Sequence, residues 1–183
     1  MKYNFSERLK FSQGKKIKTD QEIIKQAIPF CESVIKTDEV TDKSGIDYIA
    51  KLQGGAEIGI DVKTREQGCS RFWKYEEPEL VLEIWSIYPD RKNKGKRGWT
   101  LSERTNVDLI LYTFNEKDSS KYYLLPFQHL RKAFITNGKD WVKKYEKKFQ
   151  YSETWKSEAV FVPASVVLGA IMQEMQGENN MPV

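Results

Sequence analysis

An alternating pattern in residues 58–63 constrains the fold of this chain more than any other feature. Every second residue there is isoleucine or valine, and the residues between them include Asp61 and Lys63. Successive side chains of a β-strand point to opposite faces, so the apolar residues share one face and Asp61 and Lys63 share the other. Residues 46–52 form a second β-prone run, and a Gly-Gly pair lies between the two runs. The sequence therefore predicts a hairpin in which Asp47 reaches the same place as Asp61 and Lys63.

Two carboxylates and one ammonium at one place are suited to metal-dependent phosphodiester cleavage. Carboxylate oxygens hold a hard divalent cation such as Mg²⁺ or Mn²⁺. The cation lowers the pKa of a bound water, and an ammonium such as that of Lys63 positions this water and balances the developing charge. Aspartate is depleted in strands, which favours a functional role for Asp61. The alternative is a solvent-facing Asp61 paired with Lys63 or Arg65.

These residues resemble the motifs of the PD-(D/E)XK nuclease superfamily. Asp47 matches the first acidic motif, with Ile46 where the family has proline, and Asp61-Val62-Lys63 matches the (D/E)XK motif. The resemblance covers roughly residues 20–135 as an order of elements and rests on these three charged residues. It implies a restriction-endonuclease-like α/β fold with a mixed central sheet flanked by helices. It also implies that Asp47, Asp61 and the main-chain carbonyl of Val62 are the metal ligands, and that the product carries a 5′-phosphate.

The resemblance also implies a further acid on the first helix, for which Glu22 is the candidate catalytic residue. The alternative is local, because Thr19-Asp20-Gln21-Glu22 has the pattern of a capping box, which explains Glu22 without any catalysis. The family places a helix after the third core strand, whereas residues 91–106 offer at most one helical turn, at residues 102–105.

Basic and aromatic residues supply candidates for binding nucleic acid. The net charge is +4 and the pI about 8.9, which is compatible with a polyanionic partner. Arginine binds phosphate with two hydrogen bonds, tryptophan stacks on unpaired bases, and lysine adds affinity that does not depend on sequence. The alternatives are a solvated loop for residues 91–97 and core burial for the tryptophan. The candidates are Arg65, Arg71, Trp73, Lys92, Lys94, Lys96 and Arg97.

Length and composition predict one domain of residues 1–183, with a core over about residues 19–172 and a frayed tail at residues 177–183. The 183 residues contain 31% charged and 39% hydrophobic residues, two cysteines and one histidine. This composition excludes a disulfide framework and a His-rich zinc centre. No apolar run approaches the roughly 20 residues of a membrane span, and the N-terminus lacks an apolar signal core. We therefore expect a cytoplasmic protein with no membrane partner, and a homodimer is compatible with the sequence.

The hydrophobic periodicity predicts an order of mixed helices and strands. An amphipathic helix is expected over residues 20–35, kinked or divided at Pro29, and residues 107–114 are predicted to form a buried central strand. Residues 127–136 and 139–148 read as two helices parted by Asn137-Gly138. The other predicted elements are strands at residues 46–52, 57–63, 80–88, 121–126 and 160–162 and a helix at residues 166–176.

The sequence favours a Mg²⁺- or Mn²⁺-dependent nuclease that hydrolyses DNA rather than RNA, of a size and style similar to phage or mobile-element proteins. One alternative is a non-cleaving protein of the same fold that binds nucleic acid or a protein partner, such as a phage anti-defence or regulatory protein. Another is a non-nuclease in which the acidic pair is a surface feature. The retained Asp47, Asp61 and Lys63 favour the nuclease.

Overall fold

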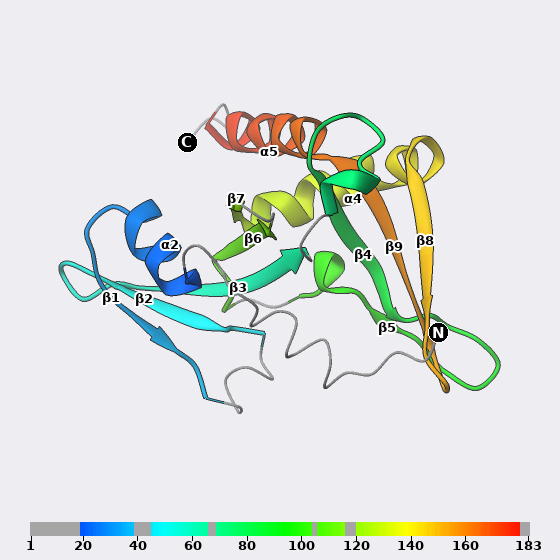
Figure 1. The fold of residues 1–183 in the computed structure, drawn as a ribbon, viewed down its shortest axis with the longest axis horizontal. Coiled ribbons are helices and arrows are strands. Elements are labelled where there is room, and N and C mark those ends of the chain that lie inside the picture. The colour runs from blue at the N-terminus through cyan, green and yellow to red at the C-terminus, as the bar shows by residue number, and fades with distance from the viewer. Residues whose placement is uncertain (1–18, 39–44, 66–68, 104–105, 116–119, 180–183) are drawn as a thin grey trace. The chain divides into compact units, whose positions relative to one another are not determined.

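The computed structural model describes residues 19–38, 45–65, 69–103, 106–115 and 120–179. Within them the chain is a mixed α/β protein with two sheets and three α-helices (Figure 1). It divides into two compact units. The five-stranded unit contains the described residues up to 72 and residues 106–127, and the four-stranded unit contains residues 73–103 and 128–179. No helix in the described ranges is both long and apolar enough to cross a membrane.

The sheet of the five-stranded unit has the order β1-β2-β3-β6-β7. Strands β3 and β6 are parallel, and every other neighbouring pair is antiparallel. The register places Asp61 opposite Ile110 and Lys63 opposite Tyr112. The strands are β1 (Cys31–Lys36), β2 (Tyr48–Leu52), β3 (Glu57–Arg65), β6 (Leu109–Asn115) and β7 (Ser120–Pro126).

Helix α2 (Asp20–Ala27) contributes to the core of the five-stranded unit. Ile60 of β3 is completely buried in this core, as the alternation predicted for the apolar side of that strand. Strand β6 is buried along most of its length, which confirms the prediction of a central strand. The residues that form this core are Ile23, Ile24, Ile28, Ala50, Ile60 and Leu111.

The N-terminal helix is much shorter than the predicted residues 20–35, and that prediction is wrong beyond Ala27. Pro29 cannot continue a helix because it has no N–H and its ring clashes with the preceding turn. Phe30 then adopts a positive φ of 58°, which turns the chain into strand β1. The apolar spacing that suggested a helix over residues 31–35 instead belongs to a strand that pairs with β2.

The sheet of the four-stranded unit is antiparallel, with the order β5-β4-β9-β8. Helix α5 (Ala164–Asn179) lies against β4 and β9. Leu80 and Val162, which are opposite each other on β4 and β9, are completely buried. The strands are β4 (Glu79–Ile87), β5 (Lys96–Arg97), β8 (Glu146–Tyr151) and β9 (Lys156–Pro163), visible together in Figure 1.

Two helix predictions in the C-terminal half are corrected. Residues 127–144 form one helix, α4 (Phe127–Lys144), with no break at Asn137-Gly138. Glycine inside a helix costs only about 1 kcal/mol relative to alanine, and the Asn137 side chain donates a hydrogen bond to the Ala133 carbonyl at 2.9 Å. Strand β8 replaces the end of the second predicted helix. In the tail, residues 177–179 continue α5, and residues 180–183 lie outside the described ranges.

The other strand predictions are confirmed with shifted ends. The helix that the family resemblance requires between β3 and β6 is absent from the described residues there. They contain the short 3₁₀ helices η1 (Cys69–Phe72) and η2 (Trp99–Leu101) together with strands β4 and β5. The predicted polar loop at residues 37–44 lies largely outside the described ranges. Both cysteines are free, as the composition predicted.

Candidate functional site

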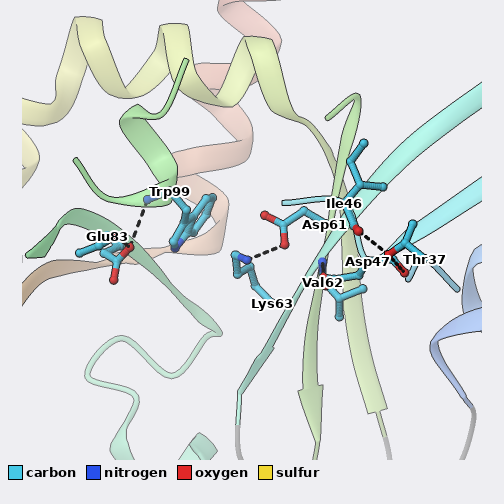
Figure 2. A network of polar contacts seen from close by, with 9 residues as sticks. Thr37, Ile46, Asp47, Asp61, Val62, Lys63, Glu83 and Trp99 are labelled. Atoms are coloured by element: carbon cyan, nitrogen blue, oxygen red, sulfur yellow. Dashed lines mark hydrogen bonds and ion pairs between the residues drawn. The ribbon is translucent and has the colours of Figure 1, made fainter. Parts of the chain in front are cut away.

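Asp61 and Lys63 form an ion pair on one face of β3. The Lys63 Nζ donates to the Asp61 Oδ1 at 2.5 Å (Figure 2). Asp61 is only 2% exposed, whereas the Lys63 side chain is 28% exposed. A buried carboxylate requires such a partner, because desolvation strongly disfavours an uncompensated charge. The pair therefore presents its ammonium, rather than its carboxylate, to solvent.

Asp47 lies beside the same segment of β3, as the predicted hairpin requires. The Val62 amide donates to the Asp47 Oδ2 at 2.6 Å (Figure 2), and the Asp47 amide donates to the Ile60 carbonyl at 2.9 Å. Only two covalent bonds separate the Val62 nitrogen from the Asp61 Cα, so this carboxylate oxygen lies no more than about 5.5 Å from that atom. The structure thus brings Asp47 to the peptide that joins Asp61 to Val62.

Thr37 fixes the main chain at Asp47. Its amide donates to the Asp47 carbonyl at 3.0 Å, and its hydroxyl lies 2.5 Å from the Ile46 carbonyl and 3.0 Å from the Asp47 carbonyl. These contacts cross from the segment that follows β1 to the segment that precedes β2. Thr37 was not among the predicted site residues, because a threonine after a strand carries no local signal of such a role.

The oxygen donors at this place suit a hard divalent cation. In the part of the chain that the structure describes, no group of three or more His, Cys, Asp or Glu side chains is placed to hold a metal ion. A metal here would have Asp47 and Asp61 as its protein carboxylates, with the Val62 carbonyl as a third oxygen. Mg²⁺ commonly keeps several waters and binds through one or two carboxylates. The donor set therefore fits Mg²⁺ or Mn²⁺.

The charge of Asp20, in the first turn of α2, reaches Tyr48 in the β2–β3 hairpin. Burial, and then the negative charges of Asp20 and Asp47, raise the pKa of the Tyr48 hydroxyl. Tyr48 is opposite Ile60 in the register, so this hydroxyl belongs to the apolar side of the hairpin.

Glu22 closes a capping box at the start of α2. Its carboxylate accepts from the Thr19 amide at 2.7 Å and from the Thr19 hydroxyl at 2.9 Å. The Glu22 amide in turn donates to the Thr19 hydroxyl oxygen at 3.2 Å. The local alternative for Glu22 is therefore what the structure describes, and its predicted catalytic role has no support from these contacts.

Replacing Glu22 with glutamine is expected to leave both stability and cleavage near the wild-type level. Glutamine also completes a capping box, so the substitution removes the charge and keeps the helix start. Thr19→Ala is the matched change to the same cap, and it is expected to lower the free energy of unfolding by about 1 kcal/mol. Denaturant unfolding and a cleavage assay check both. Loss of cleavage in a stably folded Glu22→Gln protein would show that the Glu22 carboxylate has a catalytic role.

The predicted DNA-contacting residues divide between the two units. Arg65 lies on β3, two residues beyond Lys63 and hence on the same face, and Arg71 is exposed in η1. Trp73 is partly buried in the four-stranded unit. The rest of the set lies in the same unit and is exposed, namely Lys92, Lys94, Lys96 and Arg97.

The basic segment, residues 91–97, is an ordered turn rather than a featureless loop. The Asp90 carboxylate accepts from the amides of Lys92 and Asn93, both at 2.8 Å. These hydrogen bonds lower the pKa of Asp90. Arg97 lies over the ring of Trp85, with its guanidinium carbon 4.2 Å from the ring centroid. The turn therefore holds its exposed lysines in a defined place.

If the basic segment contacts DNA, alanine at Lys92, Lys94 and Lys96 together should weaken binding and flatten its salt dependence. Each phosphate contact contributes about 0.9 to the slope of log K against log salt for duplex DNA, so three contacts would remove up to about 2.7. Fluorescence anisotropy over a salt series measures the slope. Alanine at Lys139, Lys143 and Lys144, three exposed lysines of α4, is the charge-matched control. Equal slopes in both triple variants would show that the turn makes no specific contribution.

Glu83, an acid inside a strand, has a structural role. Its carboxylate accepts from the Trp99 amide at 3.1 Å (Figure 2) and from the Ser86 hydroxyl at 2.7 Å. Gly98 fits closely beside it, because a Cβ there would lie 2.2 Å from the Glu83 carbonyl oxygen. Glu83 thus ties η2 to β4 within the four-stranded unit.

Comparison of the chain with protein-family models, with curated proteins and with solved structures found no match. The functional interpretation therefore depends on the residues of the site themselves. The main feature of the site is the ion pair between the buried Asp61 and the partly exposed Lys63, with Asp47 accepting a hydrogen bond from the intervening Val62 amide.

Proposed function

We propose that the protein is a Mg²⁺- or Mn²⁺-dependent nuclease of PD-(D/E)XK type that hydrolyses DNA phosphodiester bonds and leaves 5′-phosphate ends. The observation that supports this most is the meeting of Asp47, Asp61 and Lys63 within two adjacent strands, in the order that the motif requires. The element order α2-β1-β2-β3, with parallel β6 next to β3, adds support.

The two aspartates would hold the cation, with the Val62 carbonyl as a third oxygen. When bound, the cation supplies a water of lowered pKa and neutralises charge on a phosphoryl oxygen. Asp47 is held by the Val62 amide and by the main-chain contacts of Thr37. Such positioning keeps the carboxylates in place before substrate binds, and this lowers the reorganisation that the reaction needs.

Lys63 meets the substrate from the partly exposed side of the pair. Its ammonium, which balances Asp61, carries three donor hydrogens, so the hydrogen bond to the Asp61 Oδ1 leaves donor capacity for a phosphate oxygen or the attacking water. Arg65 is on the same face of β3 and adds a second cation. Together they attract the anionic backbone and stabilise the charge that develops on the phosphoryl oxygens.

The test is a cleavage assay with supercoiled plasmid and single-stranded DNA, with Mg²⁺, Mn²⁺ or EDTA, on the wild type and Asp61→Asn. Substitution of residues that merely support a metal ligand already costs about 10–100-fold, so loss of this ligand should cost at least about 100-fold. Asp140→Asn, the same change at an exposed residue of α4, should cleave like the wild type.

Thermal melting separates a metal-site defect from a folding defect. Mn²⁺ is expected to raise the melting temperature of the wild type and of Asp140→Asn, because a ligand that binds only the folded state stabilises it. Asp61→Asn should stay folded and lose this shift. An equal Mn²⁺-induced shift in all three proteins, or undiminished cleavage by Asp61→Asn, would refute the assignment.

A second candidate is a non-cleaving protein that uses the same residues only to bind nucleic acid. The observation in its favour is that Lys63 already balances the buried charge of Asp61 without a metal. This candidate predicts DNA binding in EDTA, no cleavage with any divalent cation, and no Mn²⁺-induced shift in the wild type.

A further inference from the structure

Aromatic rings and cations alternate on part of one face of the four-stranded sheet. In the register, Trp85 is opposite both Arg97 and Glu158, Glu158 is opposite Phe149, and Lys156 is opposite Tyr151. Residues directly opposite each other on neighbouring strands share a face. With Tyr88 directly after β4, this aromatic–basic surface comprises Trp85, Tyr88, Arg97, Lys147, Phe149, Tyr151 and Lys156.

The rings form a connected row, and each cation lies against a ring. The ring centroids of Trp85 and Tyr88 are 6.4 Å apart, and those of Tyr88 and Phe149 are 5.5 Å apart. Tyr151 continues the row at 6.4 Å from Phe149. The Lys156 Nζ lies 4.2 Å from the Tyr88 centroid and 4.8 Å from the Phe149 centroid, so one ammonium bridges two rings.

The charge that this surface presents is positive. Its acidic residue, Glu158, is buried and accepts a salt bridge from Lys147 at 2.8 Å. The hydrogen bond to Glu158 raises the pKa of Lys147, so this lysine stays protonated at neutral pH. Arg97 and Lys156 lie on the rings, and the Lys156 charge also helps to lower the pKa of the nearby Asp90 carboxyl.

The same face of the sheet is an ordinary core at its other end. Leu82 and Val160 there are completely buried, whereas Tyr151 is 67% exposed and Trp85, Tyr88 and Phe149 are partly exposed. Packing therefore explains the apolar residues at one end and leaves the exposed rings at the other end without an explanation. Exposed apolar groups that gather in one place commonly mark a binding site.

We propose that the aromatic–basic surface binds single-stranded nucleic acid. Unpaired bases stack on aromatic rings and on arginine guanidinium planes, while lysines and arginines contact the backbone phosphates. In a duplex the base faces are already stacked on one another, so they are not available to stack on the rings of this surface.

Binding of a fluorescein-labelled 15-mer of thymidine or uridine tests this proposal, by anisotropy in EDTA and low salt. Tyr151→Ala is expected to weaken binding about 5- to 150-fold, the loss of one stacked base. Lys156→Gln should weaken it and lower the slope of log K against log salt by about 0.7. The controls are Tyr122→Ala, an exposed tyrosine of the other sheet, and Lys148→Gln, whose side chain points to the opposite face of β8. Both controls should bind like the wild type.

The proposal is overturned if the wild type binds neither 15-mer, if it binds a hairpin duplex as tightly, or if the control variants lose as much affinity as the test variants. Tyr151 and Lys156 lie at or near the surface, and circular dichroism checks that each variant is folded. Because the assay contains no divalent cation, its result does not depend on the nuclease proposal. Binding of single strands in EDTA, together with no cleavage of them in Mg²⁺ or Mn²⁺, would refute only the nuclease.

Discussion

Replacing Lys63 with methionine is expected to lower the free energy of unfolding by about 3–5 kcal/mol, the cost of breaking a buried ion pair by removing one partner. Methionine retains most of the length and apolar character of the lysine stem, so the main change is the loss of the ammonium. The Asp61 carboxylate, which is buried, then loses the hydrogen bond from the Lys63 ammonium. Urea unfolding at neutral pH measures the difference.

Two comparisons identify the buried charge as the cause. The double variant Asp61→Asn, Lys63→Met should be more stable than Lys63→Met alone and recover much of the lost free energy of unfolding, because it contains no uncompensated carboxylate at residue 61. Lys51→Met is the matched control on the neighbouring strand, since Lys51 pairs with Glu57 at 3.2 Å and both side chains are about half exposed. An exposed pair is worth only about 0–1 kcal/mol. Equal losses for Lys51→Met and Lys63→Met would show that Asp61 is not isolated from water.

The hairpin around the site could be predicted from the sequence because its signals are local. Alternation of apolar and charged residues assigns each side chain of β3 to a face, and Ile60 and Asp61 lie on the faces so assigned. The glycine pair lies in the turn between β2 and β3, where both glycines have positive φ. The position of Asp47 beside β3 followed from the predicted pairing of residues 46–52 with residues 57–63.

The failures have equally local causes. Residues 31–35 have apolar spacing that fits a short helix as well as a strand, and Pro29 ended the helix rather than bending it. Asn137-Gly138 resembles a helix end, but Gly138 is buried and packs closely on the ring of Phe134. Tertiary packing overrides weak intrinsic propensity in such cases.

The four-stranded sheet could not be predicted from local sequence patterns. Strand β4 pairs with β9, about eighty residues further along the chain. The start of β8 was predicted as part of a helix, and β9 was predicted only over residues 160–162. The aromatic–basic surface arises from this pairing, because Trp85, Phe149 and Lys156 share a face only once the register is known. Long-range register has no counterpart in the periodicity of a single segment.

Gly59→Ala is expected to be the second strongly destabilising change, at about 3 kcal/mol or more, the upper end of the cost of overpacking. A Cβ at residue 59 would lie 2.2 Å from the Asn106 carbonyl oxygen. Neither side can move easily, because the Gly59 amide donates to the Asp108 carboxylate at 2.7 Å and the Asp108 amide donates to the Gly59 carbonyl at 2.8 Å. These bonds hold the segment before β6 against β3.

Gly169→Ala in α5 is the control, and it is expected to raise the free energy of unfolding instead of lowering it. The same denaturant unfolding measures both variants. A Cβ there meets nothing within 4 Å, so alanine should stabilise the helix by about 0.5–1 kcal/mol.

Because Gly59 is two residues from Asp61 on β3, its substitution should also weaken the Mn²⁺-induced shift in melting temperature. A Gly59→Ala protein as stable as the wild type would mean that the Asn106 carbonyl does not approach β3. The hydrogen bonds between Gly59 and Asp108 would then not be needed to hold β6 in its parallel pairing with β3.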